Sequence, residues 1–75
     1  MQIFIILQWY YEGDSSLVDS FIGVKKTQKE SLKLIPENGI LLADCDFKDY
    51  NGQREPKEWG QYGSISKYEI REVIL

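Results

Sequence analysis

The chain has 75 residues, of which nine are Lys or Arg, twelve are Asp or Glu and none is His. A chain of this length is expected to form a single small domain, residues 1–75, with a net stability of about 3–5 kcal/mol. Its formal net charge of −3 argues against nucleic-acid binding, which needs a basic face. The lack of histidine removes the commonest general base and metal ligand, and a single cysteine excludes an intrachain disulfide.

The first strand is predicted over residues 2–11, which read QIFIILQWYY. Apolar and aromatic side chains occupy both alternating sets of positions, so we expect a central strand that is covered at least partly on both faces. The segment lacks the basic start and the small-residue cleavage site of a signal peptide, and it is too short for a membrane-spanning helix. We therefore expect a cytoplasmic protein that makes no membrane contact.

A hairpin and a short helix are predicted next. Residues 12–16 form a cluster of turn-forming residues, and residues 17–24 are expected to pair as a strand antiparallel to the first. Thr27 and Glu30 have the spacing of a capping box, in which each side chain bonds to the backbone N–H of the other residue. Pro36 carries no N–H and cannot continue a helix. We expect a helix of about two to three turns between Thr27 and Pro36.

Two more strands are predicted, over residues 40–47 and 64–75, separated by a long loop over residues 48–63. The inner face of the strand at 40–47 is predicted to carry Leu41, Ala43, Cys45 and Phe47. Cys45 is then a buried, inert thiol. The dipeptide Asn51-Gly52 predicts a small β-turn within the loop. The fold class is therefore α+β: a small ββαββ domain with one short helix packed on a four-stranded, mainly antiparallel sheet.

Acidic side chains near the end of the third predicted strand are the best candidates for metal ligands, and they are Asp44, Asp46, Asp49 and Glu55. The calcium-loop pattern fails, however, because Lys48 stands where a ligand is needed. Asp44 or Asp46 followed by Glu55-Pro56-Lys57 is similar to the D…E-x-K arrangement of metal-dependent nucleases. However, Pro56 places that motif in a loop, and an acidic protein repels nucleic acid. We expect no metal, no cofactor and no catalytic activity.

Aromatic residues in the long polar loop indicate a binding surface. Tyr, Trp and Arg are the residue types enriched at binding hot spots, and acidic side chains beside them would steer a basic partner surface. The partner-binding residues are predicted to be Tyr50, Arg54, Trp59, Tyr62, Asp44, Asp46 and Asp49. The alternative is that Trp59 and Tyr62 fold back as a lid over a thin core.

Three short motifs carry a resemblance to a known family. They are Tyr11-Glu12-Gly13-Asp14, then Phe21-Ile22-Gly23-Val24 followed by a helix, and finally Trp59-Gly60. In this pattern the chain resembles a family of small uncharacterised bacterial and phage proteins. The family has no catalytic residues to transfer. The resemblance implies an accessory protein of a phage or mobile element, which would act in the host cytoplasm by binding and inhibiting a host factor.

The leading hypothesis is a small non-catalytic protein-interaction module, of the kind that phages use to inhibit a host enzyme or defence protein by steric occlusion. Its partner is then another protein. Two alternatives stay open. A homo-oligomeric structural or assembly protein would use partners to cover apolar first and last strands. A protein that binds a small ligand or nucleotide would have a pocket between the helix and the sheet.

Overall fold

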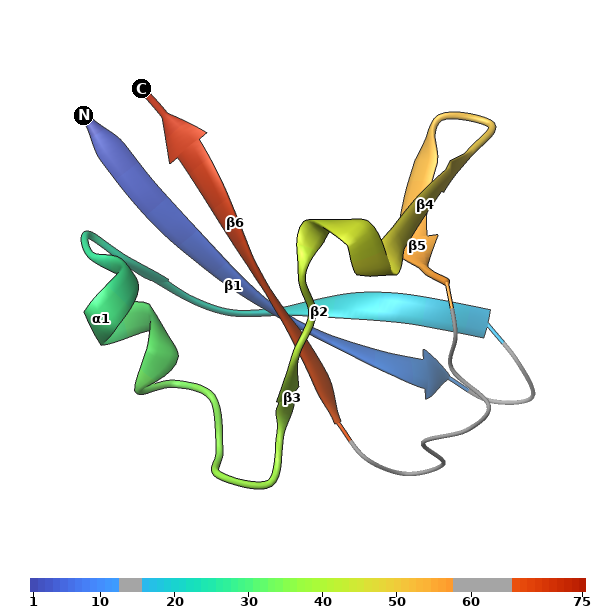
Figure 1. The fold of residues 1–75 in the computed structure, drawn as a ribbon, viewed down its shortest axis with the longest axis horizontal. Coiled ribbons are helices and arrows are strands. Elements are labelled where there is room, and N and C mark those ends of the chain that lie inside the picture. Colours follow the sequence, from blue (N-terminus) through green and yellow to red (C-terminus); the bar gives the residue numbers. More distant parts are fainter. Residues whose placement is uncertain (13–15, 58–65) are drawn as a thin grey trace.

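The computed structural model describes residues 1–12, 16–57 and 66–75 (Figure 1). The elements in this part of the chain are β1 (Gln2–Glu12), β2 (Ser16–Lys25), α1 (Gln28–Leu32), β3 (Ile40–Leu41), the 3₁₀ helix η1 (Asp44–Asp46), β4 (Phe47–Tyr50), β5 (Gln53–Pro56) and β6 (Lys67–Ile74). One sheet has the strand order β2-β1-β6-β3, and β4 and β5 form a second, two-stranded sheet. The predicted α+β fold, with one short helix and a mainly antiparallel four-stranded sheet, is confirmed. No helix in the described ranges is long and apolar enough to cross a membrane.

β1 lies inside the four-stranded sheet, as its apolar sequence predicts. It pairs antiparallel with β2 on one side and with β6 on the other, and Figure 1 shows β1 and β6 running side by side with both chain ends together. Alternation sends Phe4 and Ile6 to the face that α1 covers, which we call the helix face. Leu7 and Trp9 point to the opposite face, which the β4–β5 hairpin covers and which we call the hairpin face. All four side chains are buried, so both faces of β1 are covered.

The helix face is closed by the segment around α1. A Cβ atom on Gly23, which pairs with Ile6, would lie 3.1 Å from the side chain of Leu34, so glycine permits this close approach. The predicted N-cap of α1 is confirmed, because the Glu30 N–H donates to Thr27 Oγ1 at 3.1 Å. The reciprocal bond of the predicted capping box differs, because Glu30 Oε1 accepts from the Thr27 hydroxyl, at 3.0 Å, where the prediction had the Thr27 N–H. These two bonds fix the start of the helix, and the contact at Gly23 brings the chain that follows the helix close to the sheet.

The helix is shorter than the two to three turns predicted: it has five residues and ends at Leu32. The chain then continues in tighter turns, in which the N–H of Leu34 bonds to the carbonyl of Ser31 and the N–H of Ile35 bonds to that of Leu32. Pro36 disfavours α-helical geometry at the residue before it, and 3₁₀-type bonds commonly form where a helix ends. The predicted stop before Pro36 is therefore correct, although the last turns are not α-helical.

The strand predicted over residues 40–47 is wrong beyond Leu41. Asp46 reverses the chain, because its Oδ2 accepts from the Ala43 N–H at 2.8 Å while its own N–H donates to the Ala43 carbonyl at 3.0 Å. Local bonds from an aspartate to nearby backbone compete with strand pairing. The result is η1, which leaves Cys45 exposed where the alternation predicted burial.

A β-hairpin replaces part of the predicted long loop. The β-turn expected at Asn51-Gly52 is confirmed: both residues have positive φ, 52° and 79°, as a type I′ hairpin turn requires. The strands β4 and β5 on either side were predicted as loop, and that prediction is wrong. Phe47 at the start of β4 packs on Trp9 of β1, with ring centroids 6.1 Å apart. This contact anchors the β4–β5 hairpin on the sheet.

Candidate functional site

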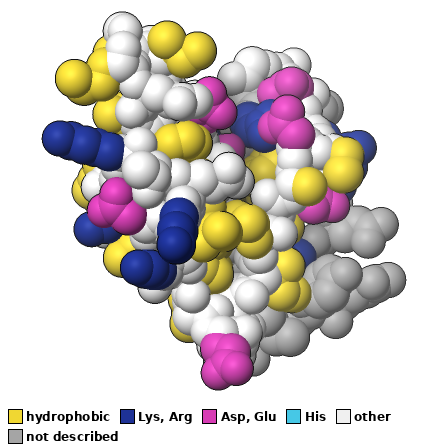
Figure 2. Space-filling model, turned by 60° about the vertical axis from the view of Figure 1, so that its left-hand side comes forward, with side chains coloured by type: hydrophobic (Ala, Val, Ile, Leu, Met, Phe, Trp, Pro, Cys, Tyr) yellow, Lys and Arg dark blue, Asp and Glu magenta, His cyan; other side chains and the backbone are white. Residues whose placement is uncertain are grey.

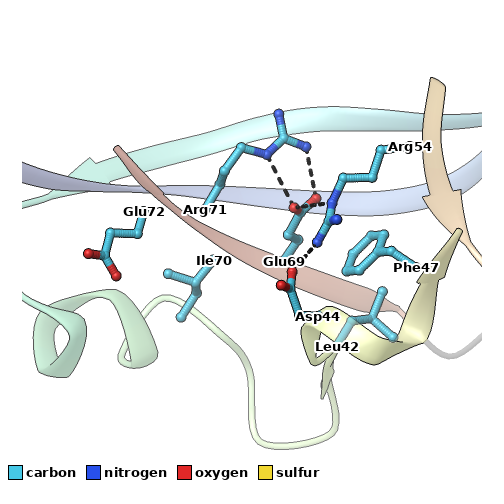
Figure 3. A pocket seen from close by; sticks show the side chains of 8 residues that line it. All are labelled: Leu42, Asp44, Phe47, Arg54, Glu69, Ile70, Arg71 and Glu72. Carbon is cyan, nitrogen blue, oxygen red and sulfur yellow. Dashed lines mark hydrogen bonds and ion pairs between the residues drawn. The ribbon is translucent and has the colours of Figure 1, made fainter. Parts of the chain in front are cut away.

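The carboxylate of Glu69 lies buried beneath the hairpin, with only 3 % of the residue exposed. It accepts hydrogen bonds from Trp9 Nε1 at 3.1 Å, from Arg54 Nε at 3.4 Å and from Arg71, whose Nε and Nη2 lie at 3.2 and 3.0 Å. Figure 3 shows both guanidinium groups converging on this carboxylate. Four hydrogen bonds and two positive charges compensate the desolvation of a buried carboxylate. Glu69 therefore joins β1, β5 and β6.

Arg54 extends this network to η1. Its guanidinium carbon lies 4.2 Å from the centroid of the Phe47 ring, and its Nη2 donates to Asp44 Oδ1. The hydrogen bond that Arg54 donates to Asp44 raises the pKa of Arg54, and the charge of Glu69 acts in the same direction. Because the pKa of Arg54 is higher in the folded protein than in the unfolded chain, its ion pairs stabilise the fold at neutral pH. This stability is lost only at strongly alkaline pH, where Arg54 would lose its proton. Arg54 thus stays charged and holds the hairpin in place throughout the neutral range.

β6 has an edge that is only partly paired. The N–H groups of Ile40 and Leu42 bond to the carbonyls of Ser66 and Tyr68, so the even-numbered residues of β6 direct their backbone groups toward β3. The odd-numbered residues bond to β1, as the two hydrogen bonds between Met1 and Leu75 show. Within the described ranges β3 pairs only with Lys67 and Tyr68.

Beyond Tyr68, the outward N–H and C=O groups therefore belong to Ile70, Glu72 and Ile74. No described residue pairs with them on that side of the strand. We call the backbone of residues 70–74 on this side the open edge of β6. An edge of this kind is a template for pairing with a further strand.

Two cavities flank the open edge. One, of about 560 Å³, lies on the hairpin face and is shown in Figure 3. Its lining includes Asp44, Arg54, Glu69 and Arg71, and also Leu42 and Phe47. The other, of about 250 Å³, lies on the helix face and is lined by five apolar residues together with Gln28 and Glu72. Ile70 and Glu72 line both cavities, so the empty volume lies directly beside the unpaired backbone.

Exposed apolar side chains surround this part of the surface. Figure 2 shows hydrophobic side chains between lysines and arginines on one side and a mixed cluster of acidic and basic groups on the other. Leu41 is 42 % exposed and Ile74 is 79 % exposed. The region thus offers apolar contact area bordered by charged groups. Protein-binding surfaces have this arrangement, with an apolar centre and a polar rim.

The structure brings together two of the residues predicted to bind a partner, because Asp44 and Arg54 form an ion pair at the cavity on the hairpin face. Asp46 and Asp49 are exposed on η1 and β4, outside that cavity. Tyr50 lies in β4. The predicted anchors Trp59 and Tyr62 lie outside the described residues.

The acidic side chains weighed as metal ligands are engaged separately. Glu55 forms an ion pair with Lys48 at 3.3 Å, whereas Asp44 pairs with Arg54. Among residues 1–12, 16–57 and 66–75 no three carboxylate or thiol side chains gather as a metal-binding group. The expectation that Glu55-Pro56-Lys57 lies in a loop is wrong for its first two residues, which end β5.

Sequence reasoning missed the residues of β6 that form the site. Alternation separated Glu69 and Arg71 from Tyr68 and Ile70 and made them the polar side of the strand. In the structure that polar side faces the hairpin, because β4 and β5 fold over it. One signal in the sequence pointed to the burial of Glu69. It lies in a strand between aromatic and aliphatic residues, where a buried charge needs a partner of opposite charge.

Amide hydrogen exchange of the free protein tests the open edge. We expect the N–H groups of Ile70, Glu72 and Ile74 to exchange at least about 100-fold faster than those of Arg71 and Val73, which bond to β1. The measurement is residue-resolved exchange by NMR. Uniform protection from residue 70 to residue 74 would show that another strand or chain already covers this edge.

Comparison with known proteins adds no family assignment: no protein-family model, curated protein or solved structure matches this chain.

Proposed function

We propose that this domain is a non-catalytic protein-interaction module, which binds another protein by adding an extended segment of that protein to the open edge of β6. The observation that carries the proposal is the row of outward N–H and C=O groups at Ile70, Glu72 and Ile74, between two cavities. A strand added there satisfies these groups through main-chain hydrogen bonds. Its alternate side chains enter the cavities on the two faces.

The part of β6 beyond Tyr68 is better suited to strand addition than β2, which is an outer strand of the sheet. The pairing of β1 with β2 shifts register between Ile6 and Leu7, which leaves Ile22 as an extra residue in β2. Such a bulge twists an edge and disturbs the regular spacing of its hydrogen-bonding groups. The pairing of β6 with β1 runs without a shift from Lys67 to Ile74. The open edge of β6 is therefore regular.

Inhibition by steric occlusion follows from this mode of binding. A segment held extended against β6 is withdrawn from any other protein that uses it. The exposed side chains of Asp46 on η1 and Asp49 on β4 attract a partner with a basic surface. As a phage-type inhibitor, the module would capture a segment of a host enzyme or defence protein in the host cytoplasm.

Peptide selection followed by NMR mapping tests the proposal. Ten-residue peptides displayed on a particle are selected on the immobilised domain, and an enriched peptide is titrated into labelled protein. We expect the largest shift changes at Ile70, Glu72, Ile74 and Leu42, with smaller changes at Asp49 on the hairpin. Failure to enrich any peptide, or shifts confined to another element, would overturn binding at β6.

A homo-oligomer is the second candidate, and exposed apolar groups on β2 favour it. Phe21 is 63 % exposed and Val24 is 45 % exposed on this outer strand. β1, in contrast, has both edges paired and offers none for self-association. Sedimentation equilibrium tests this candidate. If the protein stays monomeric at concentrations up to about 1 mM, where even weak self-association would be detected, the homo-oligomer is excluded.

A further inference from the structure

From the charges beside the open edge we infer that the captured segment is a β-strand with a lysine or arginine opposite Glu72 and apolar residues two positions to either side of it. This inference rests on the proposed function, because it specifies the chemistry of the strand that adds to β6. Three features of the site lead to it: the charge of Glu72, the apolar residues in the lining of the helix-face cavity, and the poor charge match of a second copy of β6.

Glu72 occupies the middle of the open edge and points to the helix face. Its Cα partner in β1 is Phe4, and its Oε1 accepts a hydrogen bond from Gln2 Nε2. Among the described residues no lysine or arginine forms an ion pair with it. A directly opposite residue on an added strand has its Cβ about 5 Å away, and opposite charges at that distance stabilise the pair. Glu72 thus selects a basic residue.

Apolar side chains are selected at the positions opposite Ile70 and Ile74, which share the helix face with Glu72. The cavity on this face is lined by Phe4, Leu41, Leu42, Ala43 and Ile70 as well as by Gln28 and Glu72. Its volume of about 250 Å³ is enough for an aliphatic side chain against the apolar part of this lining. Ile74 is exposed and gains an apolar neighbour from the added strand. Burying such area is the main source of favourable free energy.

On the hairpin face the requirement is different. Arg54 and Arg71 are already balanced there by Asp44 and Glu69, through ion pairs of defined geometry. A charged side chain from the added strand would disturb this balance, whereas a small hydroxyl side chain hydrogen-bonds at the cavity without adding charge. The preferred strand therefore alternates hydroxyl residues with a central basic residue and flanking apolar ones.

A second copy of this chain does not meet these requirements. If two β6 strands pair antiparallel with the register centred on residue 72, Glu72 lies opposite Glu72 of the other copy. A register centred one residue earlier sets Arg71 opposite Arg71. Like charges directly opposite are destabilising. These two registers are therefore disfavoured. A register centred on residue 73 sets Glu72 opposite Ile74, where its charge has no partner, so a basic heterologous strand is favoured.

A charge-swap experiment tests the inference with two synthetic probes. The first is the acetylated and amidated hexapeptide Thr-Val-Thr-Lys-Thr-Val, which in antiparallel pairing sets Lys opposite Glu72 and Val opposite Ile70 and Ile74. The second replaces Lys with Glu. Each is titrated by NMR into wild-type protein and into Glu72→Lys, whose folding is checked by urea unfolding. Wild-type protein should bind the Lys peptide about fivefold more tightly, and Glu72→Lys should reverse the preference.

The outcomes separate the two proposals. If neither peptide shifts the amides of Ile70, Glu72 and Ile74, strand addition itself fails and the proposed function falls. If both peptides shift them with equal affinity for both proteins, strand addition stands and the charge rule is overturned. Tighter binding of the Glu peptide by wild-type protein likewise overturns the charge rule.

Discussion

Replacing Glu69 with alanine is expected to lower the free energy of unfolding by about 3 kcal/mol, which is most of the stability of a domain this small. The substitution removes the acceptor of the buried Trp9 indole and the counter-charge of two guanidinium groups. The loss lies at the low end of the range for a broken buried pair. Arg54 and Arg71 keep 34 % and 43 % of their side-chain exposure and can be hydrated. Urea unfolding followed by circular dichroism measures it.

Two further variants serve as controls for the Glu69 prediction. Glu72→Ala removes a carboxylate from the same strand at an exposed position, and we expect it to change stability by less than about 0.5 kcal/mol. Glu69→Gln keeps an acceptor for Trp9 but loses the charge. Its free energy of unfolding should therefore lie between those of Glu69→Ala and Glu72→Ala. If Glu69→Ala unfolds at the same urea concentration as Glu72→Ala, the buried network does not stabilise the hairpin on the sheet.

Proline at two adjacent positions of β6 is expected to have opposite effects. The N–H of Glu72 faces the open edge, so Glu72→Pro should leave the ladder to β1 intact and keep the fold. The N–H of Val73 bonds to β1 opposite Ile3, so Val73→Pro should cost about 3 kcal/mol and leave little folded protein. The measurements are urea unfolding for both variants and NMR titration of a selected peptide into Glu72→Pro.

The folded Glu72→Pro protein should lose peptide binding by about tenfold or more, because the ring removes one hydrogen bond and blocks the approach of a strand. Glu72→Gln controls for the lost charge and should keep most of the binding to a neutral peptide. Unimpaired binding by Glu72→Pro would mean that peptides bind elsewhere. Equal stability of the two proline variants would contradict the hydrogen-bond pattern of β6.

Sequence patterns predicted the elements whose signals are local. The alternation in β1, the helix cap at Thr27 and the turn at Asn51-Gly52 all depend on residues within a few positions of one another. Each appears in the structure at the expected place. The antiparallel pairing of β1 and β2 also follows from a short connection between two apolar segments.

The failures arise where local and distant interactions compete. Apolar alternation up to Phe47 predicted one long strand, but Asp46 bonds to the backbone of Ala43 and turns the chain. Burial of Glu69 depends on Arg54, fifteen positions away, and on Trp9, sixty positions away. No periodicity encodes such contacts. The open edge of β6 is likewise a property of the strand order, which residue patterns do not determine.

Amide hydrogen exchange with and without the Lys-containing hexapeptide tests strand addition to the open edge of β6 most directly. Strand addition predicts that the fast-exchanging N–H groups of Ile70, Glu72 and Ile74 slow together when the peptide binds, while those of Asp46 and Asp49 are unchanged. Binding that leaves these three amides in fast exchange would contradict strand addition to β6.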